Sequence, residues 1–172
     1  MKSPYILPVL VLSSLLLSGC VSNTVVPTTP AVSPSGQPPT VQDKVNDKDM
    51  ILNLDNRGLT SVPANTFDDI NIQVLDLSHN KLTGSLPGEI RHLSHLTFLD
   101  MSYNSMTGIP AEIGQLTELE TLNLSHNQFT GLPHELGNLT HLRTLDISGN
   151  NYATADLAII EKQLPSSVTI IK

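Results

Sequence analysis

The chain has 172 residues, a formal net charge of −7 and no cluster of Lys and Arg. Nucleic-acid-binding domains carry a basic surface, so this composition argues against nucleic acid as the partner. The sequence holds one cysteine, which excludes a disulfide within the chain and a zinc site built from several thiolates.

The N-terminal residues are typical of a secretory signal. Lys2 precedes an apolar run from Tyr5 to Leu17, which is too short for a membrane span of about 20 residues. The run leads into the letters LSGC, ending at Cys20, and this tetrad resembles the lipobox of bacterial lipoproteins. The resemblance implies cleavage before Cys20, acylation of that residue and a lipid anchor in the bacterial cell envelope, with Val21 favouring the outer membrane of a diderm. A cleaved signal peptide followed by an incidental cysteine is the alternative.

The segment after the cysteine differs in composition from the rest of the chain. Residues 21–46 are dominated by Pro, Ser, Thr and Val and contain no aromatic residue. Such a segment cannot bury enough apolar surface to fold, so we expect a tether. The predicted organisation is a signal peptide over 1–19, a lipidated Cys20 with a disordered tether over 20–46, and one folded domain over 47–172.

The predicted domain repeats one phrase at a fixed period. LDLSHNKL, LDMSYNSM, LNLSHNQF and LDISGNNY follow one another at steps of 24, 23 and 23 residues. An alternating L-x-L strand cannot bury its own apolar face, so the copies are expected to stack into a parallel sheet with a continuous core. The asparagine amide in each phrase both donates and accepts, which suits it to pair buried backbone groups of the following turn. These predicted structural residues are Asn80, Asn104, Asn127 and Asn150.

The segments between the predicted strands share a second pattern. A proline opens each of LPGEIRHL, IPAEIGQL and LPHELGNL near its start, and proline suits the first turn of a short helix. The combined pattern L-x-x-L-x-L-x-x-N-x-L resembles the leucine-rich repeat family over about residues 49–152. The resemblance implies an α/β solenoid with a parallel sheet on its concave face and helical turns on its convex face.

Both ends of the array depart from the repeat. The first phrase, from Leu54, carries Arg57 in place of the asparagine, which indicates an N-terminal cap. Residues 155–164 carry apolar side chains at helical spacing, and a run rich in β-branched residues follows from Ser167. We therefore expect a C-terminal cap made of one helix and one strand.

Residues that alternate with the leucines are expected to face solvent in columns across the concave face, about 4.8 Å apart from strand to strand. The columns read Ile51, Val74, Phe98, Thr121, Thr144; then Asn53, Asp76, Asp100, Asn123, Asp146; then Asp55, Ser78, Ser102, Ser125, Ser148; then Asn56, His79, Tyr103, His126, Gly149. Phe98 and Tyr103 are expected to project from one central strand, and aromatic residues are favoured interface anchors. The predicted partner-binding residues are Asp76, His79, Phe98, Asp100, Tyr103, Asn123 and His126.

Catalytic and metal-binding alternatives find little support in these columns. Asp76 beside Asp100 could suggest paired acids or a calcium site, but no calcium-loop motif accompanies them. His79 and His126 are two repeats apart, about 10 Å, which is too far to share one zinc ion. Ser125 near a histidine lacks the nucleophile-elbow motif of a hydrolase. No catalytic residue, cofactor or metal is therefore predicted.

The family resemblance implies a non-catalytic binding module that presents its concave surface to a protein or peptide, anchored to a membrane through Cys20. The alternative function is a structural envelope lipoprotein that spaces or assembles other envelope components. Both are inferences from the fold family, since a fold alone does not determine a function.

Overall fold

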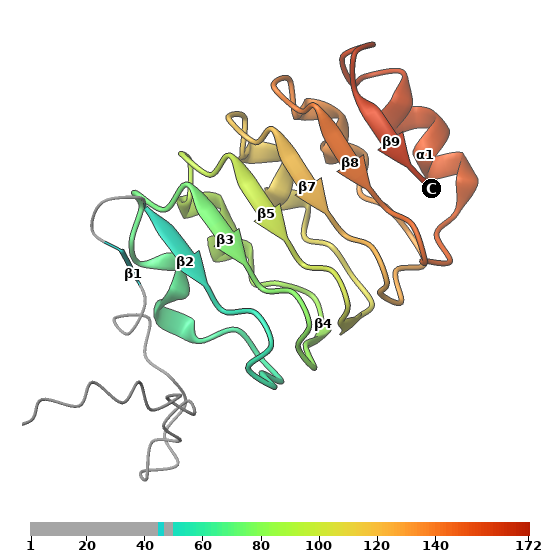
Figure 1. The fold of residues 1–172 in the computed structure, drawn as a ribbon. Helices are drawn as coiled ribbons and strands as arrows, with labels where there is room; N and C mark the ends of the chain where they lie inside the picture. Colours follow the sequence, from blue (N-terminus) through green and yellow to red (C-terminus); the bar gives the residue numbers. More distant parts are fainter. Residues whose placement is uncertain (1–44, 47–49) are drawn as a thin grey trace, which may run out of the picture. The chain divides into compact units, whose positions relative to one another are not determined.

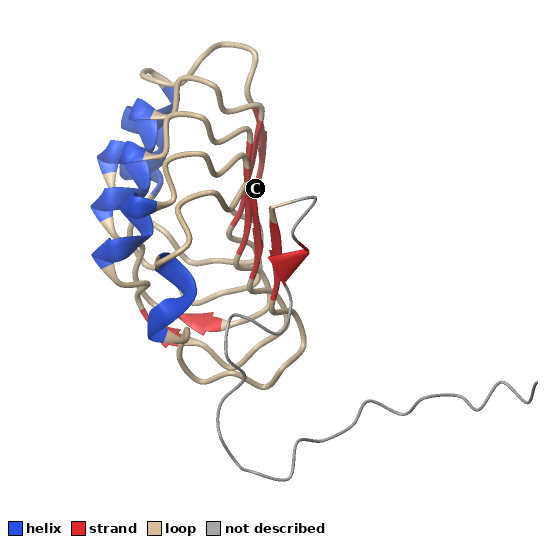
Figure 2. Cartoon of the chain, turned by 90° about the vertical axis from the view of Figure 1, so that its left-hand side faces the viewer, coloured by secondary structure: helices blue, strands red, loops and turns tan. Residues whose placement is uncertain are grey.

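The computed structural model describes residues 45–46 and 50–172. In this part of the chain the predicted architecture is confirmed, because repeated strands form a parallel sheet and short helices lie on the opposite side of the domain (Figures 1 and 2). The predicted signal peptide, the lipidation site at Cys20 and the tether up to residue 44 lie outside the described residues. Among the residues that are described, no helix has the length and apolar character of a membrane span.

Within the described residues, seven strands form the main sheet in the order β1-β2-β3-β5-β7-β8-β9. The middle residue of each repeat strand is a leucine that is fully buried, while its two neighbours are half-buried or exposed. The strands pair in the register expected from the repeat, so Leu75 lies opposite Leu99 and Leu99 opposite Leu122. The repeat strands are β2 (Ile51–Asn53), β3 (Val74–Asp76), β5 (Phe98–Asp100), β7 (Thr121–Asn123) and β8 (Thr144–Asp146).

One strand of the sheet was not expected from the sequence. β1 (Val45–Asn46) pairs antiparallel with β2, with Val45 opposite Leu52 and Asn46 opposite Ile51. The composition of residues 21–46 predicts a tether for these two residues, whereas the structure places them in the sheet. The reason is that β2 is the first strand of the parallel stack, and its outer edge presents backbone N–H and C=O groups that need partners.

Short 3-10 helices follow the prolines on the side of the domain away from the sheet (Figure 2). Each of these helices buries one apolar residue in the core: Phe67, Ile90, Ile113 and Leu136. Ile70, which follows Phe67 by three residues as Leu93 follows Ile90, is 56% exposed, because η2 belongs to the end repeat and is one residue shorter than η3. The helices are η2 (Ala64–Phe67), η3 (Gly88–His92), η4 (Ala111–Gln115) and η5 (His134–Asn138).

The C-terminal cap has the predicted form. Helix α1 (Thr154–Glu161) buries Leu157 and Ile160, and strand β9 (Thr169–Ile171) pairs parallel to β8. The Lys172 ammonium lies 2.7 Å from the Glu161 carboxylate, and this partner raises the pKa of Lys172. The ion pair joins the end of β9 to α1. A small second sheet, which was not predicted, pairs β4 (Thr83–Gly84) with β6 (Ser105–Met106) beside the main one.

Candidate functional site

The asparagine column lies in the turns that follow the strands. Asn127 is 8% exposed, and its Oδ1 accepts a hydrogen bond from the Met106 N–H of the preceding repeat at 3.0 Å. Its Nδ2 donates to the carbonyl of Met101 in that repeat at 2.9 Å, and to the carbonyls of Leu124 and Ser125 in its own. One side chain thus joins two neighbouring turns. The same pattern of bonds surrounds Asn80, Asn104 and Asn150.

The column of aspartates and asparagines at the strand ends also stabilises the turns. Oδ1 of Asp76 accepts from the Ser78 N–H at 2.9 Å, and Oδ1 of Asp100 accepts from the Ser102 N–H at 2.8 Å. These are Asx turns, in which a side-chain oxygen bonds the backbone two residues ahead. Strand alternation alone predicts only that this column faces solvent, whereas the D-x-S spacing also indicates the Asx turn. Asn53, Asn123 and Asp146 make the equivalent bond.

The serine column does not face solvent as the sequence analysis predicted. Ser78, Ser102 and Ser125 are 7%, 3% and 4% exposed. The period-two alternation of a strand ends at the aspartate, because the Asx turn bends the chain there and brings two consecutive residues inward, as for Leu77 and Ser78. The serines therefore contribute to the buried turns and not to the binding surface.

The structure brings His79, Tyr103 and His126 together in one stack. The ring centroids of His79 and Tyr103 are 4.4 Å apart with planes inclined by 9°, and those of Tyr103 and His126 are 4.3 Å apart at 20°. All three side chains are exposed, Tyr103 by 49%. They lie in the turns after β3, β5 and β7, so Tyr103 does not project from the same strand as Phe98, contrary to the sequence prediction.

These three residues share an unusual backbone conformation. Their φ angles are 52°, 53° and 52°, in the left-handed region, where bulky residues are uncommon and glycine or asparagine are favoured. The equivalent residues at the two ends of the column are Asn56, with φ of 50°, and Gly149, with φ of 68°. A Cβ at Gly149 would lie 2.7 Å from Nδ1 of His126, so this glycine leaves room for the end ring of the stack.

We use the name strand face for the residues on either side of the buried leucine in β2, β3, β5, β7 and β8, which are half-buried or exposed, together with the ring stack. Phe98 is half-buried on this face, in register with Val74 on one side and Thr121 on the other. Asp76 and Asp100 are paired neighbours, and the Asn123 amide donates to Oδ2 of Asp100 at 2.9 Å. All seven predicted partner-binding residues therefore lie on the strand face.

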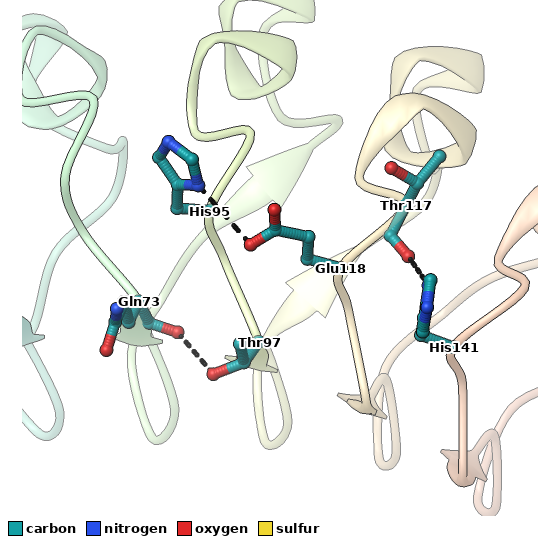
Figure 3. A network of polar contacts seen from close by, with 6 residues as sticks. All are labelled: Gln73, His95, Thr97, Thr117, Glu118 and His141. Atoms are coloured by element: carbon teal, nitrogen blue, oxygen red, sulfur yellow. Dashed lines mark hydrogen bonds and ion pairs between the residues drawn. The ribbon is translucent and has the colours of Figure 1, made fainter.

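The histidines outside the stack lie elsewhere, in segments that lead into the strands or in the helices. His95 Nδ1 lies 3.3 Å from Oε2 of Glu118, and His141 Nδ1 donates to the Thr117 carbonyl at 2.7 Å (Figure 3). His95 and Glu118 precede β5 and β7, whereas the ring stack follows those strands. In the range that the structure describes, no group of three or more His, Cys, Asp or Glu side chains could hold a metal ion.

The sequence is similar to a family profile and to segments of known proteins. A family profile described as leucine-rich repeat region matches residues 51–170. Chicken lumican is 38% identical over 63 residues, which is 36% of this chain and 18% of lumican. The human oligodendrocyte-myelin glycoprotein is 42% identical over 60 residues, covering 35% of this chain and 13% of that protein. The matched segments thus span less than a fifth of either relative.

The fold is also similar to that of solved structures. A leucine-rich repeat protein of Leptospira interrogans superimposes with a TM-score of 0.61 at 35% identity, covering 66% of this chain and 28% of that one. A chain of the Arabidopsis thaliana BIR3–SERK2 complex has a TM-score of 0.55 at 36% identity. The match covers 59% of this chain and 56% of that one. With a profile match across nearly all the described residues and strands paired repeat by repeat, the chain belongs to the leucine-rich repeat family.

Proposed function

We propose that this domain is a non-catalytic binding module that presents its strand face to a protein or peptide partner. The observation that carries the proposal is the exposed stack of His79, Tyr103 and His126 in left-handed turns. The comparisons support a binding role in general terms, since one similar structure is a plant peptide hormone receptor in complex with RGF2, with a TM-score of 0.54 at 33% identity. The matched region covers 64% of this chain and 18% of the receptor chain.

The fold alone does not require aromatic rings at these three turn positions. A residue other than glycine in a sparsely populated backbone region costs about 1–3 kcal/mol, and ring stacking returns about 0.5–1.5 kcal/mol for each pair. Asn56 and Gly149 meet the same backbone demand without a bulky ring. The rings are therefore not needed for the turn. Exposed aromatic residues at the centre of a surface are instead what binding hot spots contain.

The proposal predicts that Tyr103→Asn weakens partner binding and leaves the domain folded. Asparagine is the control for backbone strain, because Asn56 holds the same left-handed conformation. Loss of a central aromatic anchor typically lowers affinity by about thirtyfold. The partner would be captured from the envelope fraction of the source cell with wild-type protein, and its affinity for each variant measured by calorimetry.

A matched control is His95→Ala, which removes a ring from the opposite ends of the strands and is expected to leave affinity unchanged. A Phe98→Ala, Tyr103→Asn double variant that retains full affinity would move the site away from the strand face. A wild-type domain that captures no partner would favour the alternative role as a structural envelope component.

We further propose that the chain is lipidated at Cys20 and anchored in a bacterial envelope, in the outer membrane where the cell is diderm. Support comes from the LSGC letters after an apolar run and from the presence of one cysteine. Two or more acyl chains hold a protein stably at a membrane, whereas one chain is marginal. The tether predicted after Cys20 would then separate the binding module from the bilayer.

The anchor proposal predicts that Cys20→Ala abolishes incorporation of labelled fatty acid and blocks signal cleavage or releases the protein from membranes. Incorporation and membrane fractionation of wild type and variant in the same strain measure both effects. The proposal is wrong if the wild-type protein fractionates as soluble and the variant behaves identically.

A further inference from the structure

We infer that the strand face binds a cationic polypeptide segment, whose Lys or Arg side chains meet the carboxylates of Asp76, Asp100 and Asp146 beside the ring stack. The inference rests on the proposed binding function and adds to it the chemical class of the partner.

The strand face carries charge of one sign. Asp76 and Asp100 lie in register on neighbouring strands, and like charges directly opposite one another in a sheet are destabilising. The outward-facing columns of this face contain three half-buried aspartates and no Lys or Arg. The nearby cations already have partners, since Arg57 donates to the Asn53 carbonyl at the β2 edge of the face and Arg143 pairs with Glu120 at 3.2 Å. A cation supplied by a partner would relieve the repulsion.

The carboxylates have acceptor capacity left for such a cation. The Asx turns use Oδ1 of Asp76 and of Asp146, so among the described residues the second oxygen of each remains for a donor from outside. Asn123 occupies Oδ2 of Asp100 and separates the carboxylate of Asp100 from that of Asp146. Ionised carboxylates accept hydrogen bonds only, and guanidinium and ammonium groups donate only. The two kinds of group are complementary.

The ring stack determines how a partner can approach. Both faces of the Tyr103 ring are covered by histidine rings, so a partner meets a row of ring edges with the Tyr103 hydroxyl at its centre. Each ring follows an acidic or amide residue of its own repeat by three positions, as Tyr103 follows Asp100. Long basic side chains pack their aliphatic stems on apolar surface while the charged end reaches a carboxylate. The net charge of −7 adds long-range attraction for such a segment.

The test uses the full chain in an uncharged detergent and two short probe peptides, one of alternating lysine and serine and one of alternating glutamate and serine. The strand-face variant is Asp76→Asn, Asp100→Asn and Asp146→Asn in one protein. Asparagine keeps the Asx turns, because Asn53 and Asn123 already make the same bond. The matched control is Glu89→Gln, Glu112→Gln and Glu135→Gln, which removes the same charge from the 3-10 helices.

The lysine peptide is expected to bind wild type with an affinity that falls as salt rises, and the glutamate peptide is not. The strand-face variant should lose about tenfold or more in affinity, and the control variant less than about threefold. Equal losses in the two variants would overturn the inference, because only overall charge would then matter. Absence of binding by the lysine peptide, or no preference over the glutamate peptide, would also overturn it. A natural partner that needs Tyr103 but not the three aspartates would refute this inference and leave the proposed function standing.

Discussion

Replacing Asn127 with alanine is expected to lower the free energy of unfolding by about 3 kcal/mol. The amide joins two repeats, since it accepts from Met106 and donates to the carbonyls of Met101, Leu124 and Ser125. Alanine would leave these backbone groups without a partner in the interior of the stack. Buried polar groups without partners lose their hydration and gain nothing in return, which is why the expected effect is large.

Chemical denaturation followed by circular dichroism measures this effect, and Asp76→Asn provides the control. That variant keeps the Asx turn and removes one of two neighbouring negative charges, so its stability should change by less than about 0.5 kcal/mol. Equal denaturation midpoints for the two variants would contradict the role assigned to the asparagine column.

A comparable loss is expected for Gly114→Ala, which adds a methyl group between two stacked 3-10 helices. A Cβ on Gly114 would overlap the backbone of Glu135 in the next repeat, with the Glu135 carbonyl carbon 2.9 Å away. Backbone atoms in adjacent helices cannot yield as a flexible side chain can, and overpacking a well-filled core typically costs about 1–3 kcal/mol. Calorimetric unfolding should show a lower midpoint with the fold retained.

Gly108→Ala is the matched control for that experiment. A Cβ there would meet the Ser85 Cβ at 3.4 Å, an ordinary contact, and the expected change is less than about 1 kcal/mol. If both alanine variants unfold at the same temperature, the close approach of η4 and η5 does not limit the stability of the array.

The candidate site was predictable in part. The repeat places His79, Tyr103 and His126 at the same position of successive copies, so their adjacency follows from the period alone. The stacking of their rings does not follow from the period, because it depends on a left-handed turn that the strand pattern does not indicate. Sequence reasoning therefore assigned Tyr103 to the same strand as Phe98, while the structure places it beyond the strand end.

The sequence by itself determined the features that recur in every copy. A leucine at alternate positions, an asparagine after it and a proline before the helical turn each meet a local requirement, so the period alone located the strands and the buried turns. The C-terminal cap was indicated by the helical spacing of apolar residues over 155–164 and by the β-branched run that follows. The register between Leu75, Leu99 and Leu122 follows for the same reason, since a slip by one residue would turn every leucine outward.

Only the tertiary structure decided the features at the end of the array, where the neighbouring repeat is missing on one side. β1 pairs with β2 because the first strand has an open edge, and Ile70 is exposed because its repeat stands at the end of the stack. The buried serines are a different case, because the Asx turn that ends each strand is a local contact that the D-x-S spacing could have indicated. In the first two cases the local sequence pattern is the same as in the inner repeats, and the presence or absence of a neighbouring segment determines the structure.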